Sequence, residues 1–186
     1  MRPGFGVRHP ALDELLATCR PVGSGDAVWA GGRVPLRITA FAEPAVLPDE
    51  IVTSVRCIVD VRDRVVLCQN RDGEHHAWPG GRREPGESYA DTARREVHEE
   101  TGWLIDVDSL REVGWLHFEL KRPPIDASLP HPDFLQVVMR ATASSRDGGE
   151  SADWTDIEGY EMESRLVSPA EAHELVDGDP LCRLFL

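Results

Sequence analysis

Apolar positions along the chain follow the two-residue spacing of strands more often than the spacing of helices. Runs that are rich in β-branched residues, or apolar at alternate positions, predict strands at residues 35–42, 51–61, 64–69, 104–107, 113–120, 134–142 and 160–167. Only Arg62 and Asp63 separate the second run from the third, so we expect a β-hairpin there.

Helical spacing is confined to three places, and the stretches between elements are rich in turn residues. Residues 12–19 repeat apolar positions every three or four residues, and a Ser-Pro pair at 168–169 is typical of the start of a last helix. The Gly-rich run at 23–32 predicts a loop or a hairpin turn, and the runs at 122–132 and 144–156 predict further loops.

The longest predicted helix covers residues 89–101. Ser88 is suited to be its N-cap, with Asp91 three residues later in an Asp version of the capping box. Gly102 is suited to end the helix in the left-handed conformation. Local signals therefore define both ends of this helix.

This helix carries three carboxylates on one stripe. At 100° per residue, Glu96, Glu99 and Glu100 lie together, beside an apolar stripe that faces the core. Carboxylates this close repel one another, and the last turn of a helix favours cations over anions. A hard divalent cation, Mg²⁺ or Mn²⁺, would compensate for both effects. The alternative is a solvated amphipathic helix with a chance run of charge.

The helix and the loop before it resemble the signature of the Nudix hydrolase family. The pattern is Gly, five residues, Glu, seven residues, Arg-Glu, a hydrophobic residue, any residue, Glu-Glu, any residue, Gly and a hydrophobic residue. The chain supplies it with Gly81, Glu87, Arg95, Glu96, Val97, Glu99, Glu100, Gly102 and Trp103. All seven fixed identities are present, and Trp103 departs mildly from the usual aliphatic residue. The motif covers about an eighth of the chain.

The resemblance implies roles for these residues. It implies that Glu99 and Glu100 are the first metal ligands and that Glu96 is a further ligand or the base for the attacking water. It also implies that Arg95 orients a glutamate of the motif. The candidate metal contacts as a set are Gly80, through its carbonyl, and Glu87, Glu96, Glu99 and Glu100.

Candidates for substrate binding lie outside the helix. Arg71, Arg82 and Arg83 are candidates for holding phosphates, although adjacent arginines in a loop are equally typical of a solvated surface. Trp115 is a candidate for stacking on a base, although tryptophans near strands are more often core residues. Family members often add one acid from far along the chain, and the candidates are Glu158, Glu161 and Glu163, each more often a solvated surface residue.

Composition narrows the classes of protein and partner. The chain has 186 residues, of which 41% are hydrophobic and 28% charged, as is typical of one globular domain. The net charge of −13 argues against nucleic-acid and membrane partners. Four cysteines without metal-type spacing, and no signal-like or membrane-spanning run, favour a cytoplasmic protein with reduced thiols.

Together these features predict an α/β fold with a mixed β-sheet, and the resemblance implies the Nudix-type α/β/α sandwich. Residues 49–186 would form the hydrolase domain, and residues 1–48 an extension that packs on it or on a dimer partner. The implied activity is Mg²⁺-dependent cleavage of a pyrophosphate bond in a nucleoside diphosphate linked to another moiety, such as a nucleoside triphosphate or a nucleotide sugar like ADP-ribose.

Two alternatives remain at this point. The first is a binding module that senses a nucleotide without turnover, and intact motif glutamates argue against it. The second is isomerase chemistry, as in the isopentenyl diphosphate isomerases that share the fold. It would need a cysteine in the pocket, and Cys57 and Cys68 lie on predicted strands outside the motif.

Overall fold

The structure is a computed structural model that describes residues 6–29, 33–122, 130–150, 153–156, 159–176 and 179–186. The chain forms two compact units. The first consists of Met1–Thr53 and Gly114–Val137, and the second of Ser54–Val113 and Val138–Leu186. Three strands contribute residues to both units, namely β3 (Val52–Val61), β7 (Arg111–Leu120) and β8 (Asp133–Arg146).

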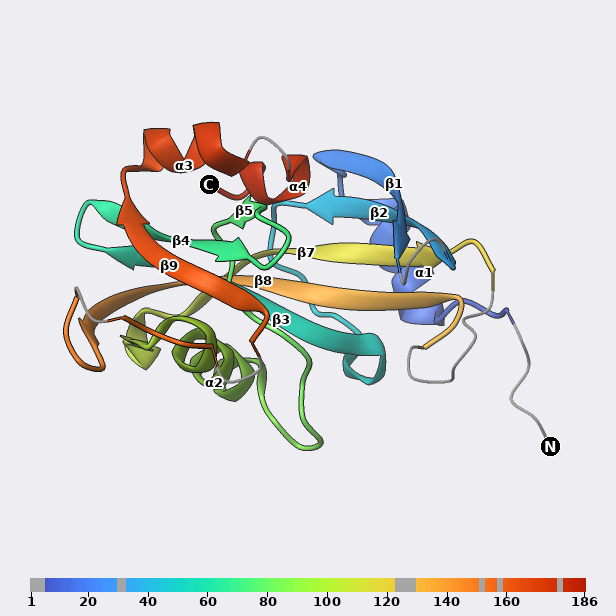
Figure 1. The fold of residues 1–186 in the computed structure, drawn as a ribbon. Coiled ribbons are helices and arrows are strands. Elements are labelled where there is room, and N and C mark those ends of the chain that lie inside the picture. The colour runs from blue at the N-terminus through green and yellow to red at the C-terminus, as the bar shows by residue number, and fades with distance from the viewer. Residues whose placement is uncertain (1–5, 30–32, 123–129, 151–152, 157–158, 177–178) are drawn as a thin grey trace. The chain divides into compact units, whose positions relative to one another are not determined.

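The first unit is built on antiparallel strands. It contains α1 (Pro10–Thr18), β1 (Gly23–Trp29), β2 (Val34–Phe41) and the 3₁₀ turn η1 (Asp49–Ile51). Strand β2 lies between β1 and β7 and pairs with both in antiparallel fashion (Figure 1). The prediction of a loop or hairpin turn at 23–32 is wrong over β1, since every residue of that strand has a partner in β2. Strand pairing here overrides the low strand propensity of glycine.

The second unit holds the remaining elements. These are β3 (Val52–Val61), β4 (Arg64–Asn70), β5 (His75–His76), α2 (Tyr89–Thr101), β6 (Trp103–Ile105), η2 (Val107–Ser109), β9 (Glu161–Val167), α3 (Pro169–Leu175) and α4 (Pro180–Arg183). Strand β4 pairs with β3, β5 and β9. In Figure 1, α2 lies on one side of these strands and α3 on the other, which gives this unit helix, sheet and helix layers.

Most predicted elements of the second unit are confirmed within one or two residues. The hairpin between β3 and β4 turns at Arg62, whose φ of 57° is left-handed. Strand β8 continues to Arg146, where it pairs with Trp103 of β6, so the start of the predicted loop at 144–156 is wrong. Helix α3 is also not the last helix, because α4 follows it. Among the described residues, none of the helices has the length and apolar character needed to span a membrane.

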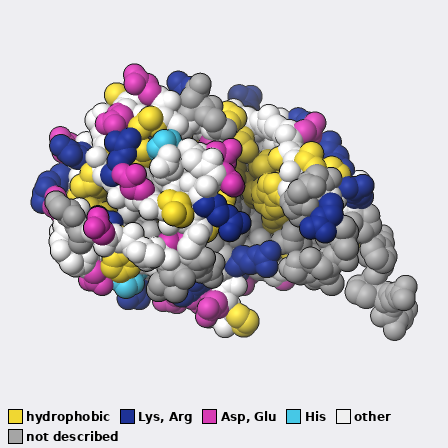
Figure 2. All heavy atoms as spheres, viewed as in Figure 1, with side chains coloured by type: hydrophobic (Ala, Val, Ile, Leu, Met, Phe, Trp, Pro, Cys, Tyr) yellow, Lys and Arg dark blue, Asp and Glu magenta, His cyan; other side chains and the backbone are white. Residues whose placement is uncertain are grey.

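Buried apolar side chains fill the strands that the pattern predicted. Cys57 and Cys68 are fully buried with free thiols, as expected for cysteines inside strands. Acidic and basic side chains are interspersed on the face seen in Figure 2. The negative net charge therefore does not make that face uniformly anionic.

Candidate active site

Helix α2 has the ends that the sequence predicts. The hydroxyl of Ser88 accepts a hydrogen bond from the backbone N–H of Asp91 at 3.1 Å, and the Asp91 carboxylate accepts one from the N–H of Ser88 at 3.4 Å. This is the predicted capping box. At the other end, Gly102 has a φ of 72° and its N–H bonds the carbonyl of His98.

The loop before the helix is fastened to strand β3. The N–H of Val55 donates to the carbonyl of Gly81 at 3.0 Å, and the N–H of Cys57 donates to the carbonyl of Pro79 at 2.9 Å. A Cβ on Gly80, which has a φ of 147°, would lie 2.2 Å from the carbonyl oxygen of Val55. Only glycine allows the loop to approach the strand this closely.

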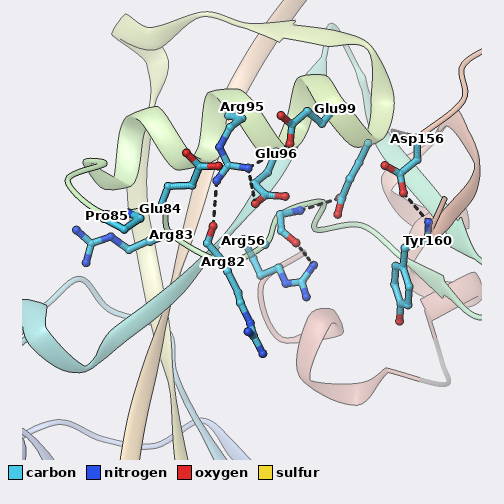
Figure 3. Close-up of a pocket in the computed structure, with 13 residues that line it drawn as sticks. Arg56, Arg82, Arg83, Glu84, Pro85, Arg95, Glu96, Glu99, Asp156 and Tyr160 are labelled. Carbon is cyan, nitrogen blue, oxygen red and sulfur yellow. Dashed lines mark hydrogen bonds and ion pairs between the residues drawn. The ribbon is translucent and has the colours of Figure 1, made fainter. Parts of the chain in front are cut away.

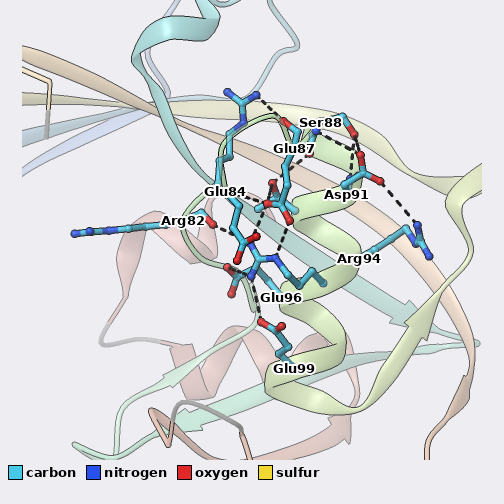
Figure 4. Close-up of polar contacts among 11 residues, drawn as sticks. Arg82, Glu84, Glu87, Ser88, Asp91, Arg94, Glu96 and Glu99 are labelled. Carbon is cyan, nitrogen blue, oxygen red and sulfur yellow. Dashed lines mark hydrogen bonds and ion pairs between the residues drawn. The ribbon is translucent and has the colours of Figure 1, made fainter. Parts of the chain in front are cut away.

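Arg95 gathers the carboxylates at the middle of the helix. Its guanidinium binds both oxygens of Glu87 at 2.8 and 2.9 Å, and also bonds Glu96 at 2.8 Å and Glu99 at 3.1 Å (Figure 4). Its remaining N–H group donates to the carbonyl of Arg82 at 2.9 Å. The hydrogen bonds from Arg95 lower the pKa of Glu87 to about 2, and the bond to Glu87 raises the pKa of Arg95. Glu87 is therefore held as a carboxylate.

Glu100 lies in a different environment. Its carboxylate accepts a hydrogen bond from the N–H of Gly80 at 2.8 Å, and Arg56 donates to the carbonyl of the same glycine. Burial raises the pKa of Glu100 to about 8, and the nearby carboxylates of Glu161 and Glu96 add to that rise. Burial also raises the pKa of Glu96. Without added positive charge, this end of the helix therefore favours a protonated glutamate.

These side chains line a cavity of about 430 Å³ (Figure 3). Glutamates of α2 lie at one side of it, and arginines of β3 and of the loop before α2 lie near them. The lining residues are Arg56, Gly80, Gly81, Arg82, Arg83, Glu84, Pro85, Arg95, Glu96, Glu99, Glu100, Asp156 and Tyr160.

Two of the four predicted substrate contacts lie in this lining, namely Arg82 and Arg83. Arg71 is not among the lining residues, and its guanidinium lies over the ring of Tyr160, 5.4 Å from its centroid. Trp115 belongs to the first unit, where it is 1% exposed and stacks on Phe41 with ring centroids 3.9 Å apart. In this position, Trp115 packs the core of that unit.

The three candidate downstream acids are placed differently. Glu158 lies outside the described residues, and Glu163 is exposed on β9. The expectation of a solvated surface acid is wrong for Glu161, which is 4% exposed and lies 2.8 Å from Nε2 of His76. Pairing of β9 with β4 buries it, and that pairing is not visible in the local sequence.

Sequence reasoning missed five residues of the cavity lining, namely Arg56, Glu84, Pro85, Asp156 and Tyr160. Arg56 had a signal, because it is the one charged residue in the first half of β3. The Asp156 carboxylate accepts hydrogen bonds from the backbone N–H groups of Tyr160 at 2.7 Å and Glu161 at 2.9 Å, and so orders the start of β9. Nothing in the local sequence distinguishes it from its acidic neighbours.

The tryptophan before Asp156 fastens the end of α2. The indole N–H of Trp154 donates to the backbone carbonyl of Glu99 at 3.0 Å, and its ring lies against His98. A Cβ on Gly102 would lie 2.5 Å from this ring. The glycine that ends the helix therefore also makes room for the indole.

The carboxylates fit a hard divalent cation. Glu96 and Glu100 are partly buried and their pKa values are raised, which means that a positive charge placed beside them would be stabilising. Gly81 leaves space for a carboxylate, since a Cβ there would lie 2.5 Å from both oxygens of Glu96. Carboxylate and carbonyl oxygens are the donors that Mg²⁺ and Mn²⁺ take.

Comparison with known proteins agrees with this geometry. The family model of the NUDIX domain matches residues 51–182. The mouse (Mus musculus) protein "Nucleoside diphosphate-linked moiety X motif 6" is 37% identical over 101 residues, which cover 53% of this chain and 30% of that protein. The matched region therefore spans less than a third of that relative.

Two solved structures share the fold. A pyrophosphohydrolase from Bacillus subtilis superimposes with a TM-score of 0.53 at 18% identity, over 77% of each chain. A NUDIX hydrolase from Nitrosomonas europaea gives 0.52 at 21% identity, over 72% of this chain and 85% of its own. The predicted α/β class and Nudix-type architecture are confirmed. With the family model matching more than half of its length, the chain belongs to the Nudix family.

Proposed function

We propose that the protein is a Mg²⁺-dependent hydrolase that cleaves the pyrophosphate bond of a nucleoside diphosphate linked to another moiety. The observation that supports this most is the cavity of the second unit, where motif glutamates lie beside three arginines, Arg56, Arg82 and Arg83. Acidic groups for a metal and basic groups for phosphates are the two needs of this reaction.

The metal would be held by Glu96, Glu99, Glu100 and the carbonyl of Gly80, with Mn²⁺ as a possible substitute for Mg²⁺. When bound, such an ion neutralises phosphate oxygens and lowers the pKa of a bound water. Glu87 is assigned a contact beyond the direct ligands, since both of its oxygens already accept hydrogen bonds from Arg95.

The chain's own groups position the reactants. Glu96 is assigned the role of a further metal ligand or of the base for the attacking water, and burial raises its pKa. Arg95 holds Glu87, Glu96 and Glu99 in one arrangement through its fork of N–H groups. The N–H of Gly80 fixes the carboxylate of Glu100.

The arginines would bind the diphosphate, and aromatic rings would contact the linked moiety. Arg82 is exposed and Arg83 half-buried, and both line the cavity, where Arg83 also donates to the carbonyl of Glu87 at 2.8 Å. Tyr160 is 41% exposed and lines the same cavity, which suits a ring that stacks on a base or packs on a sugar. The cytoplasmic location and the homodimer expected from the sequence stay predictions.

The experiment that tests this is release of phosphate or nucleotide from a panel of nucleoside triphosphates, nucleotide sugars and dinucleotides. Each compound is assayed with Mg²⁺, with EDTA, and with Glu100→Gln protein. The matched control is Glu174→Gln, which changes an exposed glutamate of α3 in the same way. Metal-dependent release that is lost only in Glu100→Gln supports the proposal. Nucleotide binding without release from any compound would favour a sensor instead.

A further inference from the structure

A second group of metal-ligating side chains lies in the interior of the second unit. Cys68 of β4, His76 of β5 and Glu161 of β9 offer ligand atoms that all lie within 4.8 Å of one another. All three residues are buried, with exposures of 0%, 8% and 4%. Strand pairing brings them together, because Cys68 is directly opposite His76 of β5, and β9 also pairs with β4, where Glu161 is opposite Asn70.

Two polar atoms of this group have no hydrogen-bond partner among the described residues. Oε1 of Glu161 lies 2.8 Å from Nε2 of His76, but Oε2 of Glu161 and Nδ1 of His76 are buried and unpaired. Buried polar atoms without a partner are rare, because each retains the cost of its lost hydration. The group therefore has unused capacity for a ligand.

The buried histidine–carboxylate pair of the first unit shows the contrast. There, Oδ1 of Asp133 lies 2.6 Å from Nε2 of His117, and Oδ2 of Asp133 accepts a hydrogen bond from Arg8 at 3.1 Å. Both carboxylate oxygens of that pair are satisfied by cationic or hydrogen-bonding side chains. The His117–Asp133 pair has the guanidinium of Arg8 as a third group, whereas the His76–Glu161 pair has the thiol of Cys68 nearby.

We propose that Cys68, His76 and Glu161 bind one borderline-soft transition-metal ion, of which Zn²⁺ is the commonest example. A thiolate, an imidazole and a carboxylate are a donor set that Zn²⁺ takes and that Mg²⁺ does not. On binding, the Cys68 thiol gives its proton to solvent, and its sulfur forms a bond to the metal with no change of oxidation state. Three protein ligands leave a fourth tetrahedral position for water.

The histidine–glutamate pair of this group needs only a small adjustment to bind one metal ion. Nitrogen and oxygen ligands at about 2.0–2.1 Å from a tetrahedral metal lie roughly 3.4 Å apart. The 2.8 Å separation of His76 and Glu161 would therefore widen by about half an ångström. Access comes from a cavity of about 220 Å³ that His76 lines together with Arg56, Trp78 and Tyr160.

This site is distinct from the glutamates of α2. It shares no side chain with the set proposed to hold Mg²⁺, although Arg56 and Tyr160 line the cavities next to both. The inference does not rest on the proposed hydrolase activity, because it needs only the donor atoms and their burial. Either proposal can fail while the other holds.

The test is titration of the metal-free, reduced protein with Co²⁺ in the presence of excess Mg²⁺. Cobalt substitutes for zinc, and its thiolate complexes have a charge-transfer absorption that carboxylate sites lack. We expect this absorption to saturate at one equivalent per chain, and one equivalent of Zn²⁺ to abolish it. Elemental analysis of protein dialysed against Zn²⁺ gives the second readout.

Variants assign the ligands. Cys68→Ser should abolish the absorption and His76→Gln should weaken Co²⁺ binding at least ~10-fold, while Cys57→Ser, which changes a buried thiol of β3, should leave both unchanged. Glu100→Gln should also leave the absorption unchanged, which separates this site from the hydrolase site. If Cys68→Ser fails to fold, the Co²⁺ absorption of the wild type and its weakening in His76→Gln still test the proposal. Absence of the absorption in the wild type, or its persistence in folded Cys68→Ser protein, overturns the proposal.

Discussion

Two glutamates of the same motif, Glu87 just before helix α2 and Glu100 in its last turn, lie in opposite electrostatic environments. Near the start, Glu87 is bound by Arg95 through both oxygens, and its pKa falls to about 2. In the last turn, Glu100 has a backbone N–H as its hydrogen-bond donor, and burial raises its pKa to about 8. Arg95 pairs directly with Glu87, whereas Arg56 beside Glu100 donates to the carbonyl of Gly80 and only partly offsets the effect of burial on the pKa of Glu100.

This difference in electrostatic environment indicates that the two glutamates have different roles, one structural and one in metal binding. The ion pair between Glu87 and Arg95 needs no further charge, and it holds the loop and the helix in one arrangement. The Glu100 end becomes favourable at neutral pH only when a positive charge arrives. Glu87, with both oxygens paired to Arg95, is suited to a structural role, whereas Glu100, whose charge burial disfavours, is suited to a metal.

The largest effect should come from substituting Glu100. We expect Glu100→Gln to lower kcat about 10³-fold, equivalent to about 4 kcal/mol, because a neutral amide is a poor ligand for a hard cation. Glu87→Gln should lower kcat by about 10-fold or less, since it would reach the metal indirectly. Steady-state kinetics at saturating Mg²⁺ measures both, and equal losses in the two variants would contradict the different roles of the two glutamates.

Arg95 should matter more for folding than any single glutamate. Arg95→Ala leaves Glu87, Glu96 and Glu99 close together without their shared cation, and we expect about 2–4 kcal/mol of lost stability. Urea unfolding of the metal-free proteins at neutral pH measures it. Arg95→Lys keeps the charge but not the paired hydrogen bonds, so its stability should lie between those of the wild type and Arg95→Ala. An unchanged midpoint in Arg95→Ala would show that the cluster is not structural.

The two ends should respond to pH in opposite directions. The folded-state pKa of Glu100 lies above its ordinary value of 4.5, so its contribution to stability is present below pH 4.5 and is lost as pH rises through about 8. The contribution of Glu87 is present above its ordinary value of 4.5 and is lost as pH falls through about 2.

Thermal unfolding of the metal-free protein across this range tests the signs. Between pH 4.5 and 8, the Glu100 contribution should fall with a slope of up to about 1.4 kcal/mol per pH unit. The slope should be reduced in Glu100→Gln and by saturating Mg²⁺. A slope that both leave unchanged would assign the pH dependence to other groups.

The smallest effect should come from the cap at the start of α2. Ser88→Ala removes the hydroxyl that accepts from the N–H of Asp91, and we expect about 1 kcal/mol of lost stability with kcat nearly unchanged. Chemical denaturation and steady-state kinetics on the same preparation check both parts. Ser88→Asn, which can cap the helix in the same way, should restore most of the stability.

The sequence predicted those parts of the site that depend on local signals. Both ends of α2 follow from Ser88, Asp91 and Gly102, because caps act through the backbone of the same turn. The motif spacing places Glu96, Glu99 and Glu100 on one face, and the structure brings all three to one cavity. Short-range geometry was sufficient for this half of the site.

The other half comes from long-range strand pairing, which a single sequence does not specify. Arg56 reaches the cavity because β3 runs beside the loop before α2, and Glu161 is buried because β9 pairs with β4. The strand β1 was missed for the same reason, since its glycines gave a turn signal that pairing with β2 overrides. Candidates chosen by residue type alone, such as Trp115, were not distinguished from core residues.

Trp154 has a consequence for protein engineering. Its indole N–H donates a hydrogen bond to the carbonyl of Glu99 in the last turn of α2, and its ring fills the space left by Gly102. A designer who grafts a new connection between β8 and β9 to change substrate preference would thus also be replacing part of the helix terminus. Such a graft must keep an indole, or an equivalent donor, at this position if the glutamates of α2 are to keep their places.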